Sequence, residues 1–582
     1  MELKRFDFSK EGRELALVEP RGKDWPVVYL INNDKKLYIG ETNSFSNRFS
    51  QHLDAKEKRG LKNIYAIFDE EFNKSAILDI EQYLIRLCSA DGKYKLLNGN
   101  AGQSATHNYY QREKYLNKLD SSDADRGIWK RLQENGLADK TFNEIVNSDI
   151  FTYSPYTSLT VEQEEVCYSV LDDILNGLEE TPLLSPNGTT CVINGGAGTG
   201  KTILGIYMSC LINNANAQEI DFYKDEESIE ASALKQSVLH KIKKYVDKHG
   251  KLNFAYVLPM GSIRKTIKKV FSSSKNGLKA NMVIGPYDIS KDKFDIVLVD
   301  ESHRLFKRKN IMNIGAYDDI CNKLGMDKYS CNSLDWIISQ SRARVLFYDK
   351  DQTVKGSDIS PEEFRHSIES TEIHEYALNT QMRCNGGKEY IEYLNNLFNC
   401  VEQPAFDSEK YQVATFSDPN KMIEKIKSLN GETGLCRTVA GYAWKWVSKN
   451  KSKEEIEATD SYDICIGDRK YYWNMSNEEW ILRPTSINEI GCIHTIQGYD
   501  LNYVGVIFGK EIDYDPILNS IVIDADKFFD VNVKKGCSSD EVKKYIINAY
   551  KVMMERGIKG CYVSACNKNL AEYFKKFFTE VK

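Results

Sequence analysis

The sequence has no two cysteines in Cys-x-x-Cys spacing, although it contains 14 cysteines among its 582 residues. Without such pairs, the chain gives no indication of a zinc ribbon or a redox dithiol. In a long chain that is not secreted, scattered cysteines are most simply reduced thiols. We therefore expect most of the cysteines to be buried and unpaired.

Long apolar runs are also missing. No stretch approaches the roughly 20 apolar residues that a membrane-spanning helix needs. The segment from Met1 to Lys10 is charged and has no apolar centre, so it does not resemble a signal peptide. We expect a cytoplasmic protein that does not bind a membrane.

The chain has little net charge, a formal −6 at pH 7. This value does not mark a nucleic-acid-binding protein, but a local basic cleft decides binding more than the sum does. A hydrophobic content of 41% and a charged content of 28% are ordinary for a globular protein. At about 150 residues per domain, the length predicts three or four domains.

The sequence does contain a glycine-rich loop between a predicted strand at 189–193 and a predicted helix at 203–211. Its pattern is Gly-x-x-x-x-Gly-Lys-Thr. In such a loop, backbone N–H groups surround the phosphates, the lysine reaches the β- and γ-phosphates, and the threonine hydroxyl binds Mg²⁺. The N-terminus of the helix also favours an anion. We therefore predict an ATP site formed by Gly195, Gly196, Ala197, Gly198, Thr199, Gly200, Lys201 and Thr202, with Thr202 as a metal ligand.

Acidic and amide side chains at the ends of two further strands complete this predicted ATPase. A wholly apolar strand at 296–299 ends in Asp300 and Glu301. We expect Asp300 to hold the Mg²⁺ shell, and Glu301 to orient or deprotonate the attacking water. A third buried strand at 345–349 leads to Gln352, which is placed to sense the γ-phosphate.

A glutamine and two arginines outside these strands are further candidates. Gln163 lies at a helix start ahead of the loop; it either reads the adenine edge or belongs to the N-cap segment that Thr160 opens. A second half of the ATPase is predicted to begin near Glu372. It offers Arg383 and Arg556 as arginine fingers for the charge of the transition state.

These segments together resemble superfamily 1 helicases, and most closely the Schlafen-group helicase-like ATPases. The resemblance covers about Ser158 to the C-terminus and implies two RecA-like lobes. Met554-Glu555-Arg556 departs from it, since superfamily 1 enzymes usually have Thr-Arg there. The motifs that carry it are Asp300-Glu301-Ser302-His303-Arg304-Leu305, Tyr348-Asp349-Lys350-Asp351-Gln352, Gln381-Met382-Arg383, Ala440-Gly441-Tyr442-Ala443-Trp444-Lys445-Trp446 and Thr495-Ile496-Gln497-Gly498.

The first hundred residues contain a different set of functional side chains. Two strands at 27–31 and 37–40 form a predicted hairpin that places Tyr29 near Tyr38. A helix follows with Arg48 and His52 one turn apart on one face. A second helix, at 75–89, has Glu81 inside an apolar stripe, a costly place for a carboxylate without a cation or metal.

This set suits the cleavage of phosphodiesters. A glutamate can hold one Mg²⁺ against a phosphate oxygen, and an arginine can balance the charge that develops on phosphorus. A tyrosine or histidine can help to deprotonate the attacking water. Taken singly, each of these residues is more simply a packing or surface group.

The module resembles a GIY-YIG nuclease domain. Val27-Val28-Tyr29 stands for the first signature, Tyr38-Ile39-Gly40 is the second, and Asn98 follows in the family's order. The resemblance implies Arg48 and Glu81 as the catalytic pair, with Glu81 as the sole protein ligand of Mg²⁺ or Mn²⁺. It also implies that Tyr29 and Tyr38 shape or activate the water. His52 stands where the family often has a histidine or tyrosine, and Val27-Val28 departs from Gly-Ile.

The sequence thus predicts an α/β protein: a small GIY-YIG-like domain at 1–105, a helical linker at 106–156, and two parallel-sheet RecA-like lobes at 157–365 and 366–582. We expect an ATP-driven translocase or helicase, acting on nucleic acid and in the first place DNA, fused to a Mg²⁺-dependent endonuclease. Anti-phage defence or DNA processing is its expected setting by analogy. The alternatives are a nucleotide-switched binding protein with an inactive or restrained nuclease, and an RNA-directed version. Nothing indicates an oligomer or a protein partner.

Overall fold

The computed structural model divides into two compact units. Unit 1 comprises Met1–Asn176, Thr202–Asn253 and Thr266–Val283, and unit 2 comprises Gly177–Lys201, Phe254–Lys265 and Ile284–Lys582. The residues that the structure describes are 1–98, 109–120, 127–180, 188–196, 198–217, 233–273, 277–311, 313–349, 352, 356–381, 384–449, 451–476, 480–496, 499–534 and 538–581.

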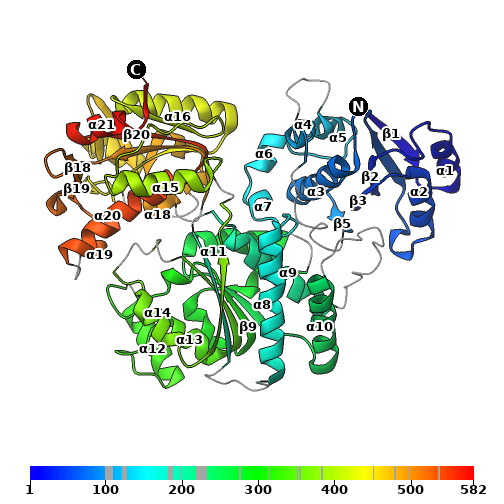
Figure 1. Ribbon diagram of the computed structural model, residues 1–582, viewed down its shortest axis with the longest axis horizontal. Coiled ribbons are helices and arrows are strands. Elements are labelled where there is room, and N and C mark those ends of the chain that lie inside the picture. Colours follow the sequence, from blue (N-terminus) through cyan, green and yellow to red (C-terminus); the bar gives the residue numbers. More distant parts are fainter. Residues whose placement is uncertain are drawn as a thin grey trace. The chain divides into compact units, whose positions relative to one another are not determined.

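Unit 1 begins with a five-stranded sheet in the order β1-β4-β2-β3-β5 (Figure 1). Its neighbouring strands are antiparallel, except that β3 and β5 are parallel. The hairpin turn is fixed by Asn33, whose side-chain oxygen accepts from the backbone N–H groups of Lys35 and Lys36. The strands are β1 (Glu2–Asp7), β2 (Val27–Asn32), β3 (Lys36–Thr42), β4 (Asn63–Phe68) and β5 (Lys95–Leu96).

Helices cover both faces of this sheet. Alternation along β2 sends Val28 and Leu30 to the core that α3 completes, and Tyr29 to the core that α2 completes. α3 starts after Asn73, whose side chain caps Ala76, and it ends at Gly92, which has a left-handed backbone. The helices are α1 (Lys10–Leu17), α2 (Phe45–Asp54), the 3₁₀ turn η1 (Lys56–Lys58) and α3 (Lys74–Asp91).

The segment predicted as a polar linker contributes to the core of the nuclease-like module. Trp129, Leu132, Ile145 and Phe151 are buried in the same apolar cluster as the residues of α3. Because these residues are spread over three short helices, no long apolar stripe marks them in the sequence. The helices of the segment are α4 (Arg112–Asn117), α5 (Ile128–Glu134), α6 (Phe142–Val146) and α7 (Asp149–Thr152).

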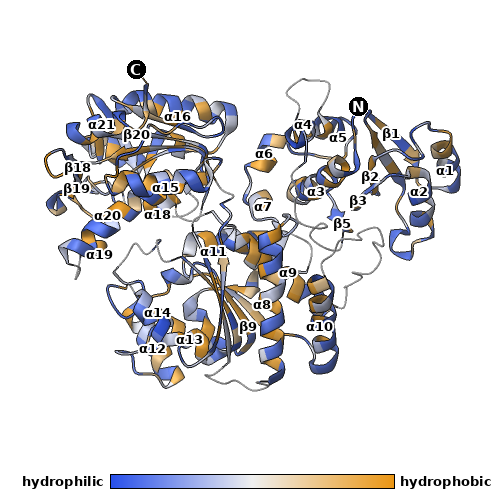
Figure 2. Ribbon diagram, viewed as in Figure 1, coloured by the Kyte–Doolittle hydropathy of each residue, from blue (hydrophilic) through white to orange (hydrophobic). Residues whose placement is uncertain are grey.

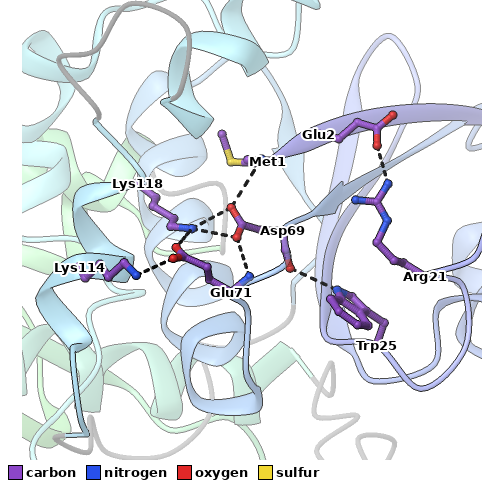
Figure 3. Close-up of polar contacts among 8 residues, drawn as sticks. All are labelled: Met1, Glu2, Arg21, Trp25, Asp69, Glu71, Lys114 and Lys118. Carbon is purple, nitrogen blue, oxygen red and sulfur yellow. Dashed lines mark hydrogen bonds and ion pairs between the residues drawn. The ribbon is translucent and has the colours of Figure 1, made fainter.

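Ion pairs add to this attachment where β4 ends (Figure 3). The ammonium of Lys118 donates to both carboxylate oxygens of Asp69 at 2.8 Å, and it also pairs with Glu71 at 2.7 Å. The indole of Trp25 donates to the carbonyl of Asp69, and the amino group of Met1 lies 3.8 Å from its carboxylate. Asp69 thus connects the chain start, a loop and the end of α4.

Unit 1 also contains long helices from the middle of the chain. α10 buries Val238, Ile242 and Val246 on one face, so it is an amphipathic helix. Figure 2 shows the same mixture of polar and apolar faces on α8. These helices are α8 (Val161–Glu180), α9 (Lys201–Ala217), α10 (Ala233–His249) and α11 (Gly261–Ser273), of which α8, α9 and α11 cross the boundary between the units.

A six-stranded sheet, in the order β11-β6-β10-β9-β7-β8, carries the predicted phosphate-binding loop. Its described strand pairs are all parallel. The central strands are mostly apolar, as Figure 2 shows, because helices cover both faces of a parallel sheet. The buried guanidinium of Arg344 on β10 is an exception, and it donates to the backbone carbonyl of Thr189. The strands are β6 (Thr189–Gly195), β7 (Phe254–Val257), β8 (Val283–Ile284), β9 (Phe294–Val299), β10 (Ser341–Tyr348) and β11 (Glu372–Leu378).

The strand that begins at Glu372 belongs to this first parallel sheet. The sequence places the start of the second half there, but β11 pairs with β6 from Glu372↔Thr189 to Leu378↔Gly195. Alternating exposure along β11 shows an edge strand, and such alternation does not specify which sheet the strand joins. Helices α12 (Ile314–Leu324), α13 (Ser333–Gln340) and α14 (Pro361–Ile368) precede it.

The second parallel sheet starts after β11 and has the order β14-β15-β16-β13-β17-β20-β12-β21. Only the β14–β15 pair is antiparallel among its described pairs. Apolar clusters cover both faces. The strands are β12 (Gln412–Phe416), β13 (Cys436–Ala440), β14 (Ile464–Ile466), β15 (Arg469–Trp473), β16 (Glu489–Gly491), β17 (Leu501–Phe508), β20 (Gly557–Ala565) and β21 (Thr579–Val581).

Helices and a hairpin complete the second half. The helices are α15 (Gly387–Phe398), α16 (Pro419–Thr433), α17 (Lys453–Thr459), α18 (Ile493–Ile496), α19 (Val531–Lys534), α20 (Ser539–Met554) and α21 (Lys568–Lys575), and the hairpin is β18 (Ile512–Asp515) with β19 (Ser520–Ile523). Among the described helices, none is both long enough and apolar enough to cross a bilayer. The predicted fold class, a small α/β module followed by two parallel sheets, is confirmed.

Candidate active sites

The first candidate site is built on the hairpin of β2 and β3. Tyr29 lies opposite Gly40 in the register of the two strands. A Cβ atom on Gly40 would come within 2.3 Å of the Tyr29 hydroxyl, so only glycine lets this ring lie across β3. The rings of Tyr29 and Tyr38 are 6.3 Å apart. Packing against Tyr29 therefore explains why Tyr38 and Gly40 are needed in the second signature.

Three predicted side chains meet at the hydroxyl of Tyr29. Nε of Arg48 donates to it at 3.3 Å, and Nε2 of His52 lies 2.7 Å from it. Tyr38 packs edge-on against His52, with ring centres 5.1 Å apart. Two strands and helix α2 thus bring together residues that are separated by up to 23 positions in the sequence.

The protonation states in this cluster follow from burial. Burial, reinforced by the charges of Lys58 and Arg48, lowers the pKa of His52 to about 3. Burial also raises the pKa of Tyr29 well above its usual value. His52 is therefore neutral and Tyr29 is protonated at physiological pH. Tyr29 accepts from Nε of Arg48, and the tautomer of the neutral His52 decides which group donates in the bond between the Tyr29 hydroxyl and Nε2.

Lys58 is a member of this cluster that the sequence did not predict. Its ammonium lies 2.9 Å from the centre of the Tyr38 ring, and only 6% of its surface is exposed. A cation over an aromatic face is stabilised by the ring quadrupole. Lys58 comes from η1, ten positions after Arg48, so no helical or strand periodicity links the two residues.

Glu81 supplies the acidic side of the site. It is half-buried on α3, between Ile77 and Leu84, which are fully buried, as the apolar stripe predicts. Its charge contributes to the raised pKa of Tyr29, so the carboxylate is close enough to act electrostatically on the same cluster. No group of three or more acidic, histidine or cysteine side chains that could hold a metal occurs in the described part of the chain. A single partly exposed carboxylate still fits Mg²⁺, which keeps waters and takes phosphate oxygens as further ligands.

Asn98 has a structural position next to this site. Its side chain accepts from the backbone N–H of Ile39 at 3.1 Å and donates to the carbonyl of the same residue at 2.8 Å. These two bonds continue the pairing of β3 beyond β5. Asn98 therefore fixes the strand that carries Tyr38 and Gly40.

The second candidate site lies where β6 ends. Gly198 and Gly200 have φ of 80° and 81°, a conformation that other residues rarely adopt. The ammonium of Lys201 folds over the loop and donates to the carbonyls of Gly195 at 2.6 Å and Gly196 at 2.8 Å. Thr199 closes the loop through its hydroxyl, which donates to Gly196 at 3.1 Å. Ala197 lies outside the described residues.

Asp300 and Glu301 follow β9 at the same edge of the first parallel sheet. β9 and β6 both pair in parallel with β10, so their carboxyl ends are neighbours. Asp300 is fully buried, and its carboxylate accepts from the hydroxyl of Tyr256 at 3.0 Å and from the backbone N–H of Glu301 at 2.9 Å. These bonds orient a carboxylate that could join the Mg²⁺ shell.

Glu301 is held in its charged form by its neighbours. Burial raises the pKa of this carboxyl, but His303, 3.0 Å away, and the positive charges of Lys201 and Arg556 outweigh burial and lower it. Glu301 also has φ of 50°, a left-handed conformation that is uncommon outside glycine. A buried, ionised and backbone-constrained carboxylate suits the orientation of an attacking water.

Asp349 links the predicted γ-phosphate sensor to the phosphate-binding loop. The side-chain N–H of Gln352 donates to Oδ2 of Asp349 at 2.7 Å, and the ammonium of Lys201 lies 3.4 Å from the same oxygen. The sequence places Asp349 at the end of a strand and within a motif of the resemblance, but it gives this residue no role. Its position at the end of β10, next to β6, is the signal that could have identified it.

Four predicted ATPase residues remain: Thr202, Gln163, Arg556 and Arg383. Thr202 lies on the first turn of α9, in unit 1. Gln163 forms the reciprocal cap at the start of α8, because its side-chain oxygen accepts from the N–H of Thr160 and its own N–H donates to the Thr160 hydroxyl. Its adenine-reading role stays a prediction. Arg556 is buried and influences Glu301, whereas Arg383 lies outside the described residues.

Comparison with known proteins agrees with this geometry. The family described as Schlafen group 3, DNA/RNA helicase domain, matches residues 188–567, and the GIY-YIG catalytic domain matches residues 26–95. The chain belongs to the Schlafen group 3 helicase family. The family match includes the first parallel sheet and all of the second except β21, and the GIY-YIG match contains Tyr29, Tyr38, Arg48, His52 and Glu81. The predicted resemblance is confirmed for both parts.

Comparisons with individual proteins give low sequence identities. An uncharacterized protein of Saccharomyces cerevisiae is 24% identical over 461 residues, which cover 74% of this chain and 93% of the yeast protein. A Bacteroides Pif1 helicase in complex with ADP-AlF3 and ssDNA is 11% identical with a TM-score of 0.26, covering 71% of this chain and 94% of that chain. The Candida albicans Pif1 helicase is 12% identical with a TM-score of 0.26, covering 72% and 99%.

Proposed function

We propose that this Schlafen group 3 family member is an ATP-driven DNA translocase or helicase whose N-terminal module is a metal-dependent endonuclease. The observation that carries the proposal is the meeting of Arg48, His52 and Tyr29 at one hydroxyl, on a chain that also has a complete phosphate-binding loop. A cytoplasmic location and a role in DNA processing or anti-phage defence belong to the same proposal.

In the ATPase site, Glu301 would act on the water. An ionised carboxylate at the end of β9 can accept a proton from a water that attacks the γ-phosphate. Lys201, which contacts the loop carbonyls and Asp349, would exchange these contacts for phosphate oxygens. Gln352 would report this exchange because it shares Asp349 with Lys201. Mg²⁺ would supply charge neutralisation beside Asp300.

In the nuclease site, the neutral His52 would be the proton acceptor. Its Nε2 lies 2.7 Å from the Tyr29 hydroxyl and its ring packs against Tyr38, and the two tyrosines would orient the attacking water. Arg48 would balance the charge that develops on the phosphate. A divalent cation held by Glu81 would supply the Lewis-acid contribution to the same phosphate.

Separate loss of the two activities tests the proposal. We expect Glu81→Gln to abolish nicking of supercoiled DNA and to leave ATP hydrolysis intact. Lys201→Ala should abolish ATP hydrolysis, while Mg²⁺- or Mn²⁺-dependent nicking without ATP survives. Glu70→Gln is the matched control, because Glu70 is an exposed acid of the same module. Undiminished nicking by Glu81→Gln would sink the nuclease assignment.

Matched DNA and RNA substrates decide between the proposal and its alternatives. ATP hydrolysis that is stimulated by DNA, without scission under any Mg²⁺ or Mn²⁺ condition, would favour a nucleotide-switched binding protein. Stimulation and scission with RNA alone would favour the RNA-directed version. Strand separation or displacement of a bound protein along duplex DNA would show whether the motor unwinds or translocates.

A further inference from the structure

A loop rich in tryptophan and lysine follows β13 in the second parallel sheet. β13 pairs in parallel with β16 and β17, so the segments that follow these three strands leave at the same edge of the sheet. In parallel α/β sheets, this carboxyl edge is where ligands bind. We call residues 442–449 of this loop the aromatic strip.

The indole rings of the strip are anchored but remain accessible. Trp444 and Trp446 pack partly against the apolar cluster beneath β13, and both are only half-buried. The ring of Trp446 lies 6.1 Å from that of the fully buried Trp473. Half-buried rings that a core holds in place lose little conformational entropy when a ligand stacks on them.

Exposed cations alternate with these rings. Lys445 and Lys449 are exposed, and neither forms an ion pair with a carboxylate anywhere in the described part of the chain. The ammonium of Lys449 lies 5.5 Å from the ring centre of Trp446, and that of Lys445 lies 5.8 Å from the ring of Phe529. Residues 441–453 contain four lysines and no acidic residue, in a protein with a net charge of −6.

We propose that the aromatic strip is a binding surface for single-stranded DNA. Bases would stack on Trp444 and Trp446, while Lys445 and Lys449 would contact the phosphates. Aromatic platforms beside cations are the arrangement that binds single strands, and stacking contributes about 1–3 kcal/mol per base. The inference rests on the proposed function, because it names the substrate strand and the surface that holds it.

Charge distinguishes this occupant from an apolar peptide, and hydroxyl groups distinguish DNA from RNA. A polyanion explains two lysines without carboxylate partners next to two indoles, whereas an apolar segment does not. The polar uncharged groups of the strip are already in use. The Ser448 hydroxyl donates to Asp463, and the Tyr442 hydroxyl lies 3.4 Å from the sulfur of Cys492. The strip therefore offers no free hydroxyl to a ribose 2′-OH.

Binding of labelled (dT)₂₀ to the full-length chain tests the proposal, with Glu81→Gln as background in every sample to prevent cleavage. We expect Trp444→Ala/Trp446→Ala to weaken binding by about tenfold or more, from the loss of stacking. Trp444→Phe/Trp446→Phe should recover most of the affinity, because phenylalanine retains a ring. Circular dichroism and thermal melts check that the alanine variant remains folded.

The salt dependence of the binding constant tests whether Lys445 and Lys449 contact phosphates. Each phosphate contact on a single strand contributes a slope of about −0.7 to the dependence of log K on log[salt]. Lys445→Ala/Lys449→Ala should therefore make the slope shallower by about 1.4. Lys421→Ala/Lys425→Ala removes the same charge from exposed positions of α16 and should leave the slope unchanged.

The outcomes separate this proposal from the proposed function. If the background protein binds (dT)₂₀ and neither double variant changes the affinity or the slope, the strip is not the binding surface, and the motor assignment stands. If the background protein binds no nucleic acid at all, the proposed function fails first. Tighter binding of (rU)₂₀ than of (dT)₂₀, lost in the same variants, would overturn the choice of DNA.

Discussion

The nuclease-like site of unit 1 and the ATPase-like site of unit 2 each place a buried proton acceptor among cations, but burial acts on the two acceptors in opposite directions. For His52, burial and the charges of Lys58 and Arg48 all favour the neutral ring. For Glu301, burial opposes the charged carboxylate, and its neighbours must overcome that effect. We infer that the state of His52 is robust to loss of one neighbour, whereas the state of Glu301 depends on them.

The two sites also differ in what positions them. Side-chain packing across a hairpin, with Gly40 beneath Tyr29, aligns the nuclease-like cluster. Backbone conformation aligns the ATPase-like cluster, through left-handed Gly198 and Gly200 and the left-handed Glu301. A packing site is most sensitive to added volume, and a backbone site is most sensitive to a changed functional group.

The largest effect should come from Glu301→Gln. This change keeps the shape of the side chain but removes the proton acceptor, and general-base catalysis typically contributes about 10²–10⁴-fold. We expect kcat for ATP to fall by that factor while nucleotide affinity stays close to wild type. Steady-state ATP hydrolysis and equilibrium binding of a fluorescent nucleotide measure the two quantities. Glu375→Gln, an exposed acid of β11, is the control. A loss below tenfold would contradict the role of Glu301.

Gly40→Ala should have the next largest effect, and only on the nuclease. The added methyl would occupy the position of the Tyr29 hydroxyl, so the ring must move away from His52. A displacement of about 1 Å can cost about 10²-fold in rate, and overpacking costs about 1–3 kcal/mol in stability. DNA nicking and thermal melts are the measurements. Gly431→Ala is the control, because a Cβ there meets nothing within 4 Å. Normal nicking by Gly40→Ala would show that the hairpin register does not position Tyr29.

The sequence predicted those parts of both sites that local patterns encode. The phosphate-binding loop, the acids after β9 and the tyrosine hairpin depend on neighbouring residues and on strand-end rules. Lys58 could not be predicted, because it reaches Tyr38 from a short 3₁₀ turn with no periodic relation to Arg48. The contact between Asp349 and Lys201 depends on the strand order β6-β10-β9, which the sequence does not specify.

The same limit applies to the fold. The strands β6, β7, β9 and β10 of the first parallel sheet each contain an apolar run, so the sequence predicted them well. The amphipathic strand β11 gave no indication of its partner, and it joins β6 because register and edge position are tertiary properties. The helices α4 to α7 looked polar because each contributes few apolar residues to the common core.

A smaller effect is expected on the pH dependence of the two activities, and it distinguishes Glu301 from His52. His303→Gln removes the neighbour that most strongly lowers the pKa of Glu301, so that pKa should rise. The acid limb of kcat/KM for ATP, which lies below pH 5 in the wild type, should then move into the range above pH 5. Lys58→Met should leave the nuclease without an acid limb from His52 between pH 5 and 8, because burial is the first cause of its low pKa. Activities measured from pH 5 to 9 test both expectations. An acid limb of the ATPase that does not move would show that Glu301 does not depend on His303. A new acid limb of the nuclease near pH 6 would show that His52 depends on Lys58.

The smallest expected effect is on folding stability. Its dependence on pH reports the protonation of His52 without any measurement of catalysis. The pKa of His52 is lowered from 6.5 to about 3, so between these values the unfolded chain binds the proton and the folded chain does not. Stability should therefore be fully present above pH 6.5 and should fall as the pH decreases, by about 1.5 kcal/mol between pH 6.5 and 5. His52→Gln cannot take up this proton, so its free energy of unfolding should fall less over the same range. Urea unfolding followed by circular dichroism at pH 6.5 and 5 measures the difference. Equal losses in both proteins would show that His52 is not held neutral by the fold, and the contrast with Glu301 would then rest on the ATPase site alone.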